Sequence, residues 1–277
     1  ALRRLREVVR GGTGHLEVVE IRFDPEIVSS ESASSPWADQ RVLLLAGEPG
    51  SASFTYAEEL ARALVHQSAH PILASERADA DEPPTAIDRR TLNPDEPEQL
   101  TELLRELTTD KPLAAILDTR VLDAAAVNEE SSDAELLFGS VTDRCDRVMR
   151  LCQAAGKTVQ PADSPSWRGI WTLTCGAVAR STDDPPVRLA QSPAWGMVRV
   201  AMLEFTELRP GIMDLDPAQH DAGAAVLDAL AALGEKENQM LVRQGQWSVA
   251  RLEPVEEGDL DGQSAVGPAS LPKPPYR

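Results

Sequence analysis

The stretch Leu189-Ala-Gln-Ser-Pro-Ala-Trp-Gly-Met-Val-Arg-Val-Ala-Met-Leu-Glu204, followed by Gly211-Ile-Met-Asp-Leu-Asp-Pro217, decides the fold of this chain. Proline suits the first turn of a helix, where the N–H that it lacks would have no partner. A helix is therefore predicted from Pro193, with Gln191 or Ser192 as its cap. Four large apolar residues recur at helical spacing and predict one apolar face: Trp195, Val198, Met202 and Phe205.

The run Ile212 to Leu215 follows as a predicted buried strand, so the stretch is half of an α/β unit. Similar halves fill the rest of the chain. Further strands are predicted at 16–23, 41–46, 71–74, 113–117, 169–174, 239–243 and 247–252. Further helices are predicted at 54–67, 97–107, 131–155 and 217–233, with a short basic helix-like piece at 1–10. This alternation predicts an α/β fold, a Rossmann-like parallel sheet flanked by helices, closed by a β-hairpin that turns at Gly245.

Composition excludes several classes of partner. The formal net charge is -18, from 45 acidic and 27 basic residues, which argues against binding to nucleic acid or to an anionic membrane. No apolar run reaches the length of a membrane span, and the N-terminal residues do not resemble a signal peptide. The scattered Cys145, Cys152 and Cys175 predict neither a disulfide framework nor a metal site, and a reducing, cytoplasmic location is expected.

Local composition predicts three segments. Residues 1–38 are expected to be a strand and a Ser/Glu/Pro-rich linker that arrive from an upstream domain, and residues 39–253 form the Rossmann-like domain. Residues 254–277, rich in Glu, Asp, Gly and Pro, are expected to be a linker to a downstream domain. The abrupt start and the Pro-rich end are typical of cuts in a longer polypeptide.

A Rossmann-like sheet makes nucleotide binding the first hypothesis, and the turn after Leu45 is the place to test it. That turn has Gly47 and Gly50, but not the G-x-G-x-x-G spacing. Glu48 would place a negative charge beside a pyrophosphate, and Pro49 removes a donor N–H. Although Glu76 could bind a ribose hydroxyl, an ordinary strand-to-helix turn is the favoured interpretation.

The residues of a hydride-transfer site are also missing. Gly11-Gly-Thr-Gly14 looks like the phosphate loop of a short-chain reductase, but it precedes an alternating strand instead of a helix. Such a reductase needs a tyrosine as acid with a lysine or asparagine partner. Of the two tyrosines, Tyr56 has no lysine within the next turn, and Tyr276 lies in the terminal linker.

Other chemistries find no better support. His66 and His70 are i,i+4, but Pro71 should end the helix before His70, and His15 and His220 stand apart. Cys175 follows a strand and is interpreted as a buried structural cysteine. The carboxylate pairs Asp183-Asp184 and Asp214/Asp216 are interpreted as turn and cap residues. We therefore predict no catalytic, cofactor-binding or metal-binding residue in this chain.

The run Val187 to Glu204, with Gly211 to Asp216 after it, closely resembles the structural subdomain of ketoreductases in modular type I polyketide synthases. Its most specific part is Trp-Gly-x-x-Arg-x-x-x-x-Glu, from Trp195 to Glu204. Supporting segments lie in the family's order at 16–23, 116–123, 148–154, 171–177, 237–243 and 247–252. The resemblance covers roughly residues 16–253.

The resemblance implies a truncated Rossmann fold that has lost its cofactor and catalytic residues. It implies a scaffold that packs against and stabilises a catalytic ketoreductase subdomain, which carries the NADPH site, next to dehydratase and enoyl reductase domains. Residues 272–277 resemble the approach to an enoyl reductase. The alternatives are a stand-alone NAD(P)-dependent Rossmann-fold reductase and a degenerate pseudo-reductase of a methyltransferase-containing module.

Overall fold

The computed structural model describes residues 6–10, 16–25, 35–77, 86–123, 134–179, 187–218, 223–232 and 237–254. The chain divides into two compact units. The smaller unit, residues 1–24 with 250–277, contains an antiparallel pair of strands, β1 (Arg6–Arg10) and β2 (Leu16–Pro25). The larger unit, residues 25–249, contains the α/β fold.

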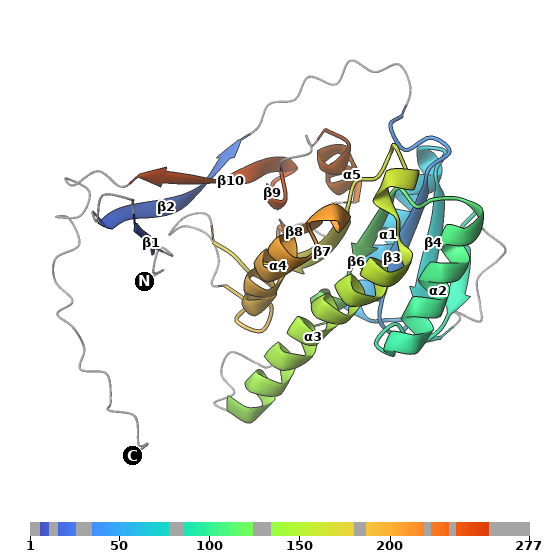
Figure 1. The fold of residues 1–277 in the computed structure, drawn as a ribbon, viewed down its shortest axis with the longest axis horizontal. Coiled ribbons are helices and arrows are strands. Elements are labelled where there is room, and N and C mark those ends of the chain that lie inside the picture. Colours follow the sequence, from blue (N-terminus) through green and yellow to red (C-terminus); the bar gives the residue numbers. More distant parts are fainter. Residues whose placement is uncertain are drawn as a thin grey trace. The chain divides into compact units, whose positions relative to one another are not determined.

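The larger unit alternates strands with helices, as the sequence predicts (Figure 1). Its strands are β3 (Arg41–Leu45), β4 (His70–Ser75), β5 (Asp88–Thr91), β6 (Ala115–Asp118), β7 (Ile170–Cys175), β8 (Pro210–Leu215), β9 (Gln239–Arg243) and the first part of β10 (Gln246–Pro254). Its α-helices among the described residues are α1 (Ala52–His66), α2 (Pro97–Asp110), α3 (Ala134–Thr158), α4 (Ser192–Glu204) and α5 (Gly223–Ala232).

The sheet has the doubly wound order β10-β9-β8-β7-β6-β3-β4-β5. All neighbours from β9 to β5 are parallel, and β10 runs antiparallel to β9. The chain starts at β3 in the middle, moves outward to β5, and then returns to β6 on the other side of β3. This reversal between β3 and β6 is the topological switch point, where Rossmann folds bind nucleotides. The predicted Rossmann-like fold is therefore confirmed.

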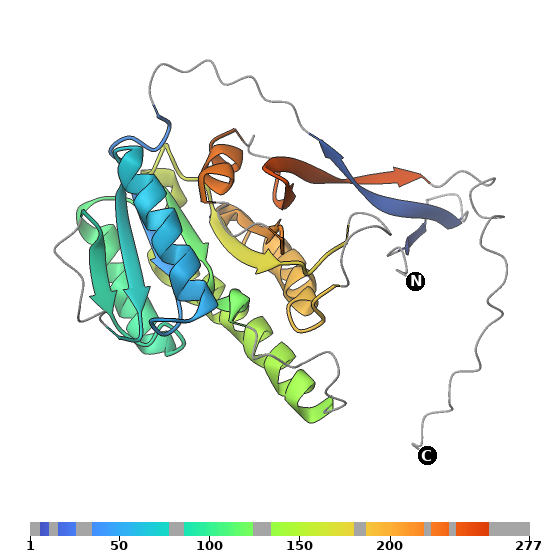
Figure 2. The same ribbon diagram turned by 180° about the vertical axis from the view of Figure 1, so that it is seen from behind.

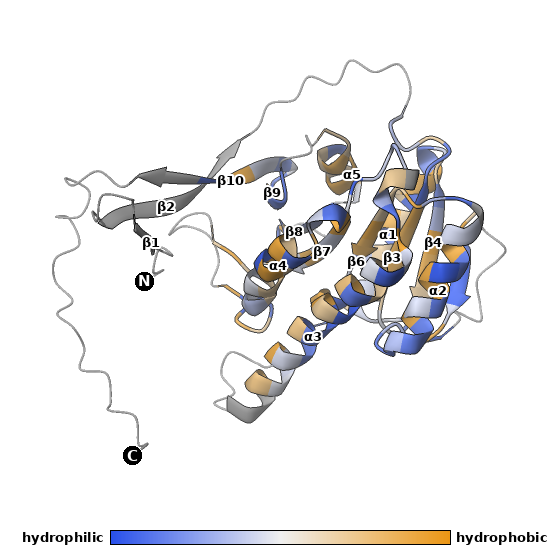
Figure 3. Cartoon of the chain, in the orientation of Figure 1, coloured by the Kyte–Doolittle hydropathy of each residue, from blue (hydrophilic) through white to orange (hydrophobic). Residues whose placement is uncertain are grey.

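Helices cover both faces of the sheet. Figure 1 views the face covered by α2, α3 and α4, and Figure 2 views the opposite face, covered by α1 and α5. Hydropathy follows these layers: β3 after Arg41 and β6 before Asp118 are coloured as hydrophobic (Figure 3). Each crossover carries a helix except that from β4 to β5, where residues 76–77 and 86–87 are described and hold none.

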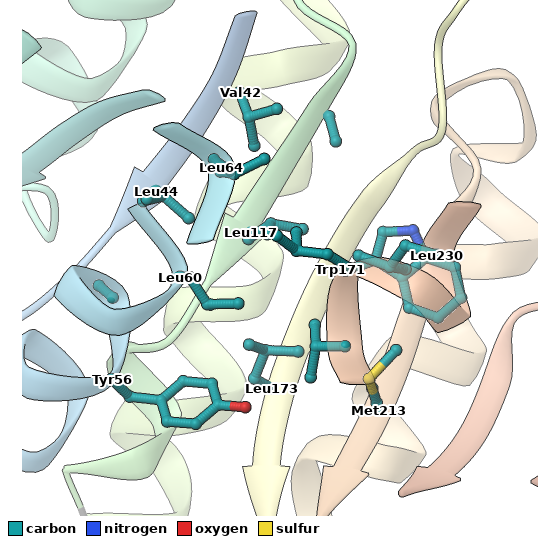
Figure 4. Close-up of a cluster of buried hydrophobic side chains, with 14 of the residues drawn as sticks. Val42, Leu44, Tyr56, Leu60, Leu64, Leu117, Trp171, Leu173, Met213 and Leu230 are labelled. Atoms are coloured by element: carbon teal, nitrogen blue, oxygen red, sulfur yellow. The ribbon is translucent and has the colours of Figure 1, made fainter. Parts of the chain in front are cut away.

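Alternation along β3 builds two cores. Val42 and Leu44 pack with Leu60 and Leu64 of α1, in the cluster that Figure 4 shows. The alternate side chains of β3, Leu43 and Leu45, enter the cluster on the other face. There they pack with residues of α2 and α3: Leu100, Leu104 and Leu151. Because successive strand residues point to opposite faces, one five-residue strand buries side chains in both layers.

The closing hairpin is confirmed together with its turn. β9 and β10 pair antiparallel, with Gln246 opposite Arg243. The two turn residues both have positive φ, 54° at Gln244 and 74° at Gly245. A two-residue turn with positive φ at both positions matches the right-handed twist of its strands, so glycine suits the second position.

Three predicted elements are wrong in detail. The basic piece at 1–10 is a strand from Arg6 to Arg10, not a helix. The polar connection after β4 contains an edge strand, β5, whose Asp-Arg-Arg-Thr sequence has no hydrophobic alternation to reveal it. Helix α5 begins at Gly223 and not at Pro217, because Asp216 Oδ1 accepts the Ala218 N–H at 2.9 Å and holds a turn there.

Trp37 is the anchor of the segment before β3. Its side chain is fully buried in the α1 and α5 layer, and its Nε1–H donates to the Leu227 carbonyl at 3.1 Å. The predicted linker 27–38 therefore ends in a core residue.

Candidate functional site

The candidate site lies where the carboxyl ends of β3 and β6 diverge, at the N-terminus of α1. The amides in the first turn of a helix lack helical partners and attract anions. In α1, Ser51 is the N-cap and its Oγ accepts the Phe54 N–H at 3.2 Å. Gly47 N–H, at the end of β3, donates to Ser53 Oγ at 2.8 Å.

An aspartate of the chain itself sits at this N-terminus. Asp123, just after β6, accepts the Ser53 backbone N–H on Oδ1 at 2.8 Å, and its Oδ2 accepts the Ser53 hydroxyl. A Cβ added at Gly47 would overlap Asp123 Oδ2. The carboxylate thus occupies the space beside Gly47 and Ser53, at the helix N-terminus where doubly wound folds hold a pyrophosphate.

Two polar side chains hold Asp123 in place. Thr119 Oγ1 donates to the carbonyls of Leu45 at 2.8 Å and Ser53 at 3.0 Å, which ties the end of β6 to β3 and α1. Arg144 of α3, which is buried, donates to the Asp123 carbonyl at 2.9 Å. Burial lowers the pKa of the Arg144 guanidinium. The turn that carries Asp123 is therefore fixed from both sides.

Carboxylates also gather where the ribose of a dinucleotide would lie. The pKa of Glu76, just after β4, is raised by its burial and then by the nearby carboxylates Glu48 and Asp95. Burial first, and then the two neighbouring carboxylates, disfavour the charged form of Glu76, and a further anion at this position would be repelled by the same groups. The hypothesis that Glu76 binds a ribose hydroxyl is not supported by these surroundings.

A network of ion pairs around the buried Arg120 lies at the carboxyl end of β6. Arg120 is 1% exposed and makes bidentate hydrogen bonds to Asp118, with Nε and Nη2 each 2.8 Å from a carboxylate oxygen. Arg120 Nη1 donates to Asp95 at 2.8 Å, and Arg147 of α3 also pairs with Asp95, at 3.0 Å. This network joins β6 to the loop before α2 and engages the Arg120 guanidinium with carboxylates of the chain itself.

The titratable residues singled out in the sequence do not converge. Tyr56 is a buried residue of α1. His66 ends α1 and His70 begins β4, where its Nε2 lies 3.9 Å from Asp39 Oδ1. Cys175 is half-buried, and burial raises the pKa of its thiol. Four other candidates lie outside the described residues: Gly11–Gly14, His15, His220 and Tyr276, together with the pair Asp183-Asp184.

Asp214 is a buried structural carboxylate. Its side chain, fully buried in β8, pairs with Arg243 of β9 and accepts the Thr174 hydroxyl at 2.6 Å and the Ala177 N–H at 2.8 Å. Burial raises the Asp214 pKa, opposed by the Arg243 cation. Asp216 likewise accepts backbone N–H groups at turns, from Ala218 and Gln244.

Helix α4, in the stretch that decides the fold, buries Trp195 and Val198 as predicted, whereas Met202 and Phe205 are only half-buried. Ala194, Trp195, Val198 and Ala201 are buried, and the Trp195 Nε1–H lies 3.2 Å from Thr174 Oγ1. Gln191 is the N-cap, but it makes no side-chain cap and its Oε1 accepts the Cys175 N–H at 2.7 Å instead. The Gln191 side-chain oxygen therefore hydrogen-bonds to the neighbouring strand β7 instead of to the first turn of α4.

Sequence reasoning missed Asp123 as a functional residue. The aspartate lies 70 positions after Ser53. Only the parallel pairing of β3 with β6 brings the two together. The signal in the sequence was weak: Asp123 is an acidic residue in the loop after β6, the strand beside β3.

Within the described ranges, no helix is long and apolar enough to cross a membrane. The same residues contain no group of three or more histidine, cysteine or carboxylate side chains placed to hold a metal ion.

The strand order and the switch point define a doubly wound α/β domain of the Rossmann-like architecture. A family model described as "Polyketide synthase extender module SpnB, Rossmann fold domain" matches residues 74–252, well over half of the chain. The chain belongs to this family, as a ketoreductase-related domain of a modular polyketide synthase.

Curated relatives are very long polyketide synthases. Polyketide synthase GfsA of Streptomyces halstedii is 36% identical over 96 residues, which is 35% of this chain and 1% of that protein. Erythronolide synthase EryA2 of Saccharopolyspora erythraea is 36% identical over 100 residues, 36% of this chain and 3% of that protein. The chain thus spans a small part of the relatives that it matches.

Solved structures agree on the fold. A C2-type ketoreductase from a modular polyketide synthase superposes with a TM-score of 0.60 at 21% identity, covering 86% of this chain and 43% of that one. A carbonyl reductase from Pseudomonas aeruginosa PAO1 gives a TM-score of 0.52 at 15% identity, covering 73% of this chain and 95% of that one. At these identities the likeness concerns fold alone.

Proposed function

We propose that this chain is a non-catalytic scaffold of a type I polyketide synthase, which packs against a catalytic ketoreductase subdomain and stabilises it. The observation that carries the proposal is Asp123, whose carboxylate takes the anion-binding amide of Ser53 at the start of α1. A domain that fills this position with its own side chain has no use for a nucleotide phosphate there.

The charges at the carboxyl ends of β3 and β4 also support a non-catalytic role. Glu48, Glu76 and Asp95 would repel a dinucleotide. The cations close to them are paired within the chain, Arg147 with Asp95 and Asp143 and Arg120 with Asp118 and Asp95. With these carboxylates in place, the edge between β3 and β4 disfavours an anionic cofactor. The proposal therefore assigns no cofactor to this chain, and NADPH would belong to the partner subdomain.

The outer face of α4 offers a surface for that partner. Three residues at i, i+4 and i+7 spacing define it, and we name them the α4 stripe: Gly196, Val200 and Leu203. Leu203 is 81% exposed and Val200 46%. No atom lies within 4 Å of a Cβ built at Gly196, so this helix glycine is not required by packing inside the chain.

A glycine inside a helix costs about 0.5–1 kcal/mol relative to alanine. That cost is explained if a partner backbone approaches α4 closely at Gly196, with Val200 and Leu203 buried on either side of the contact. The catalytic ketoreductase subdomain is the partner that the family context supplies. The precise neighbours in the synthase, a dehydratase upstream and an enoyl reductase downstream, are part of the same proposal.

Titration with NADPH tests the proposal. We expect no saturable change in NADPH fluorescence with the 277-residue chain, whereas an active ketoreductase assayed in parallel should saturate. An Asp123→Ala variant should gain a detectable affinity for inorganic phosphate, seen as a rise in its melting temperature that the parent lacks. Saturable micromolar binding of NADPH by the parent chain would instead support the stand-alone reductase.

A further inference from the structure

Arg144 of α3 is a buried cation that has no ion pair with any carboxylate of the described residues. Its side chain is 3% exposed. The nearby Asp143 pairs with Arg147 instead. The two carboxylate oxygens of Asp123 are both directed to Ser53. A charge buried without a counter-ion is costly, so the guanidinium must be held by hydrogen bonds to neutral groups.

Those hydrogen bonds join two separate elements. Nη2 of Arg144 donates to the Asp123 carbonyl at 2.9 Å. Nε donates to the Val121 carbonyl at 3.3 Å, in the short helical turn η1 (Arg120–Leu122). Nη1 donates within α3 to Ser140, to its carbonyl at 2.6 Å and to its hydroxyl. The planar fork of one guanidinium therefore connects α3 to the turn that carries Asp123.

The amino-terminal part of α3 has little other attachment to the fold. None of the side chains from 137 to 143 is buried, and Phe138 is 72% exposed. This part of the helix projects beyond α4 in both views (Figures 1 and 2). Apolar side chains are buried only later in the helix, from Val148 onward. Arg144 is therefore the first fully buried side chain between position 137 and the carboxyl-terminal half of α3.

We propose that Arg144 is a positioning residue that holds the Asp123 carboxylate at the first turn of α1. Its hydrogen bonds to the Val121 and Asp123 carbonyls fix the backbone of this turn, and the Asp123 side chain is then within reach of the Ser53 N–H. When Arg144 leaves these carbonyls, Asp123 loses its position and the Ser53 N–H becomes free. The closed amino terminus of α1 is thus a conformational state that α3 maintains.

Hydrogen exchange of single backbone amides, followed by NMR in the full chain, tests this role. Arg144→Met removes the guanidinium and keeps an apolar side chain of similar length. We expect the Ser53 amide to exchange about tenfold faster than in the parent, the loss typical of a hydrogen bond from a charged group. The Phe54 N–H donates to Ser51 Oγ and should keep its rate. An arginine that only stabilised α1 would change both amides together.

Two further variants complete the comparison. Arg150→Met is the matched control, because Arg150 lies on α3 but binds Asp146 and the Asp95 carbonyl instead of η1. It should leave the exchange of Ser53 unchanged. Arg144→Lys keeps the charge, but a single ammonium group cannot reproduce the fork that holds both carbonyls. It should give a smaller acceleration than Arg144→Met, and it carries the test if Arg144→Met does not fold.

A double variant shows whether Arg144 acts through Asp123. In Asp123→Ala the Ser53 amide has already lost its acceptor, so adding Arg144→Met should change its exchange by less than about twofold. The proposal is overturned by parent-like Ser53 exchange in the folded Arg144 variants, by equal acceleration of Phe54, by the same effect in Arg150→Met, or by additive effects in the double variant. The inference rests on the Asp123 contact that the proposed function also uses. The NADPH titration measures cofactor binding by the parent chain, so the two proposals fail separately.

Discussion

At the scale of single residues, Trp195 joins the family motif to the core. Its indole is 4% exposed, and its N–H lies beside the Thr174 hydroxyl of β7. Truncation would leave a cavity between α4 and the sheet. We expect Trp195→Ala to lower the free energy of unfolding by roughly 3–5 kcal/mol in urea titrations. Trp195→Phe, which keeps most of the ring, should lose much less; equal losses would mean that the helix faces another way.

Cys152 of α3 is the most strongly perturbed thiol. Burial, with a smaller effect from Asp118, raises its pKa to about 12. An acid whose pKa is raised on folding contributes stability that is complete below its unfolded pKa, near 9, and is lost as pH rises toward 12. The parent chain should therefore lose stability relative to Cys152→Ala by up to about 1.4 kcal/mol per pH unit above about pH 9.

Urea unfolding at about pH 8 and about pH 10.5, on either side of the unfolded pKa, measures this difference. Cys145→Ala is the matched control, because Cys145 is only half-buried. It should show a smaller change between the two pH values, and an equal change would remove the assignment to burial.

At the scale of elements, two glycines have opposite requirements. Gly245 has φ 74° in the β9–β10 turn, whereas Gly196 is inside α4 with open space around it. Gly245→Ala should cost about 1–2 kcal/mol, because a Cβ disfavours the left-handed backbone. Gly196→Ala should gain about 0.5–1 kcal/mol in the isolated chain. Thermal and urea unfolding measure both, and a loss at Gly196 would contradict the open space found there.

At the scale of the whole molecule, the α4 stripe should govern assembly and not folding. Leu203→Glu should change the stability of the isolated chain by less than about 0.5 kcal/mol, since the side chain is exposed. It should weaken association with the catalytic ketoreductase subdomain of the same synthase about tenfold or more, if the leucine is central to the contact. Calorimetry or co-purification measures the association.

Leu189→Glu is the matched control for that experiment. Leu189 is also exposed, at 58%, but it precedes α4 and lies outside the stripe. Its change should leave association intact. If both variants associate like the parent chain, α4 is not the docking surface.

The sequence by itself determined the alternation of strands and helices, the Gly245 hairpin and the absence of a G-x-G-x-x-G turn. These features are local: hydrophobic period, proline, glycine and motif spacing are all readable within a few residues. The family was also readable, because the stretch from Trp195 to Glu204 is specific and the family model includes it.

Tertiary structure alone decided which residues distant in the sequence come into contact. The β5 strand is polar and is fixed by pairing with β4, and Trp37 is buried in the layer formed by α1 and α5. Asp123 reaches Ser53 because β6 lies beside β3. Parallel sheets bring together residues separated by whole crossovers, so contacts of this kind have no signature in a local pattern.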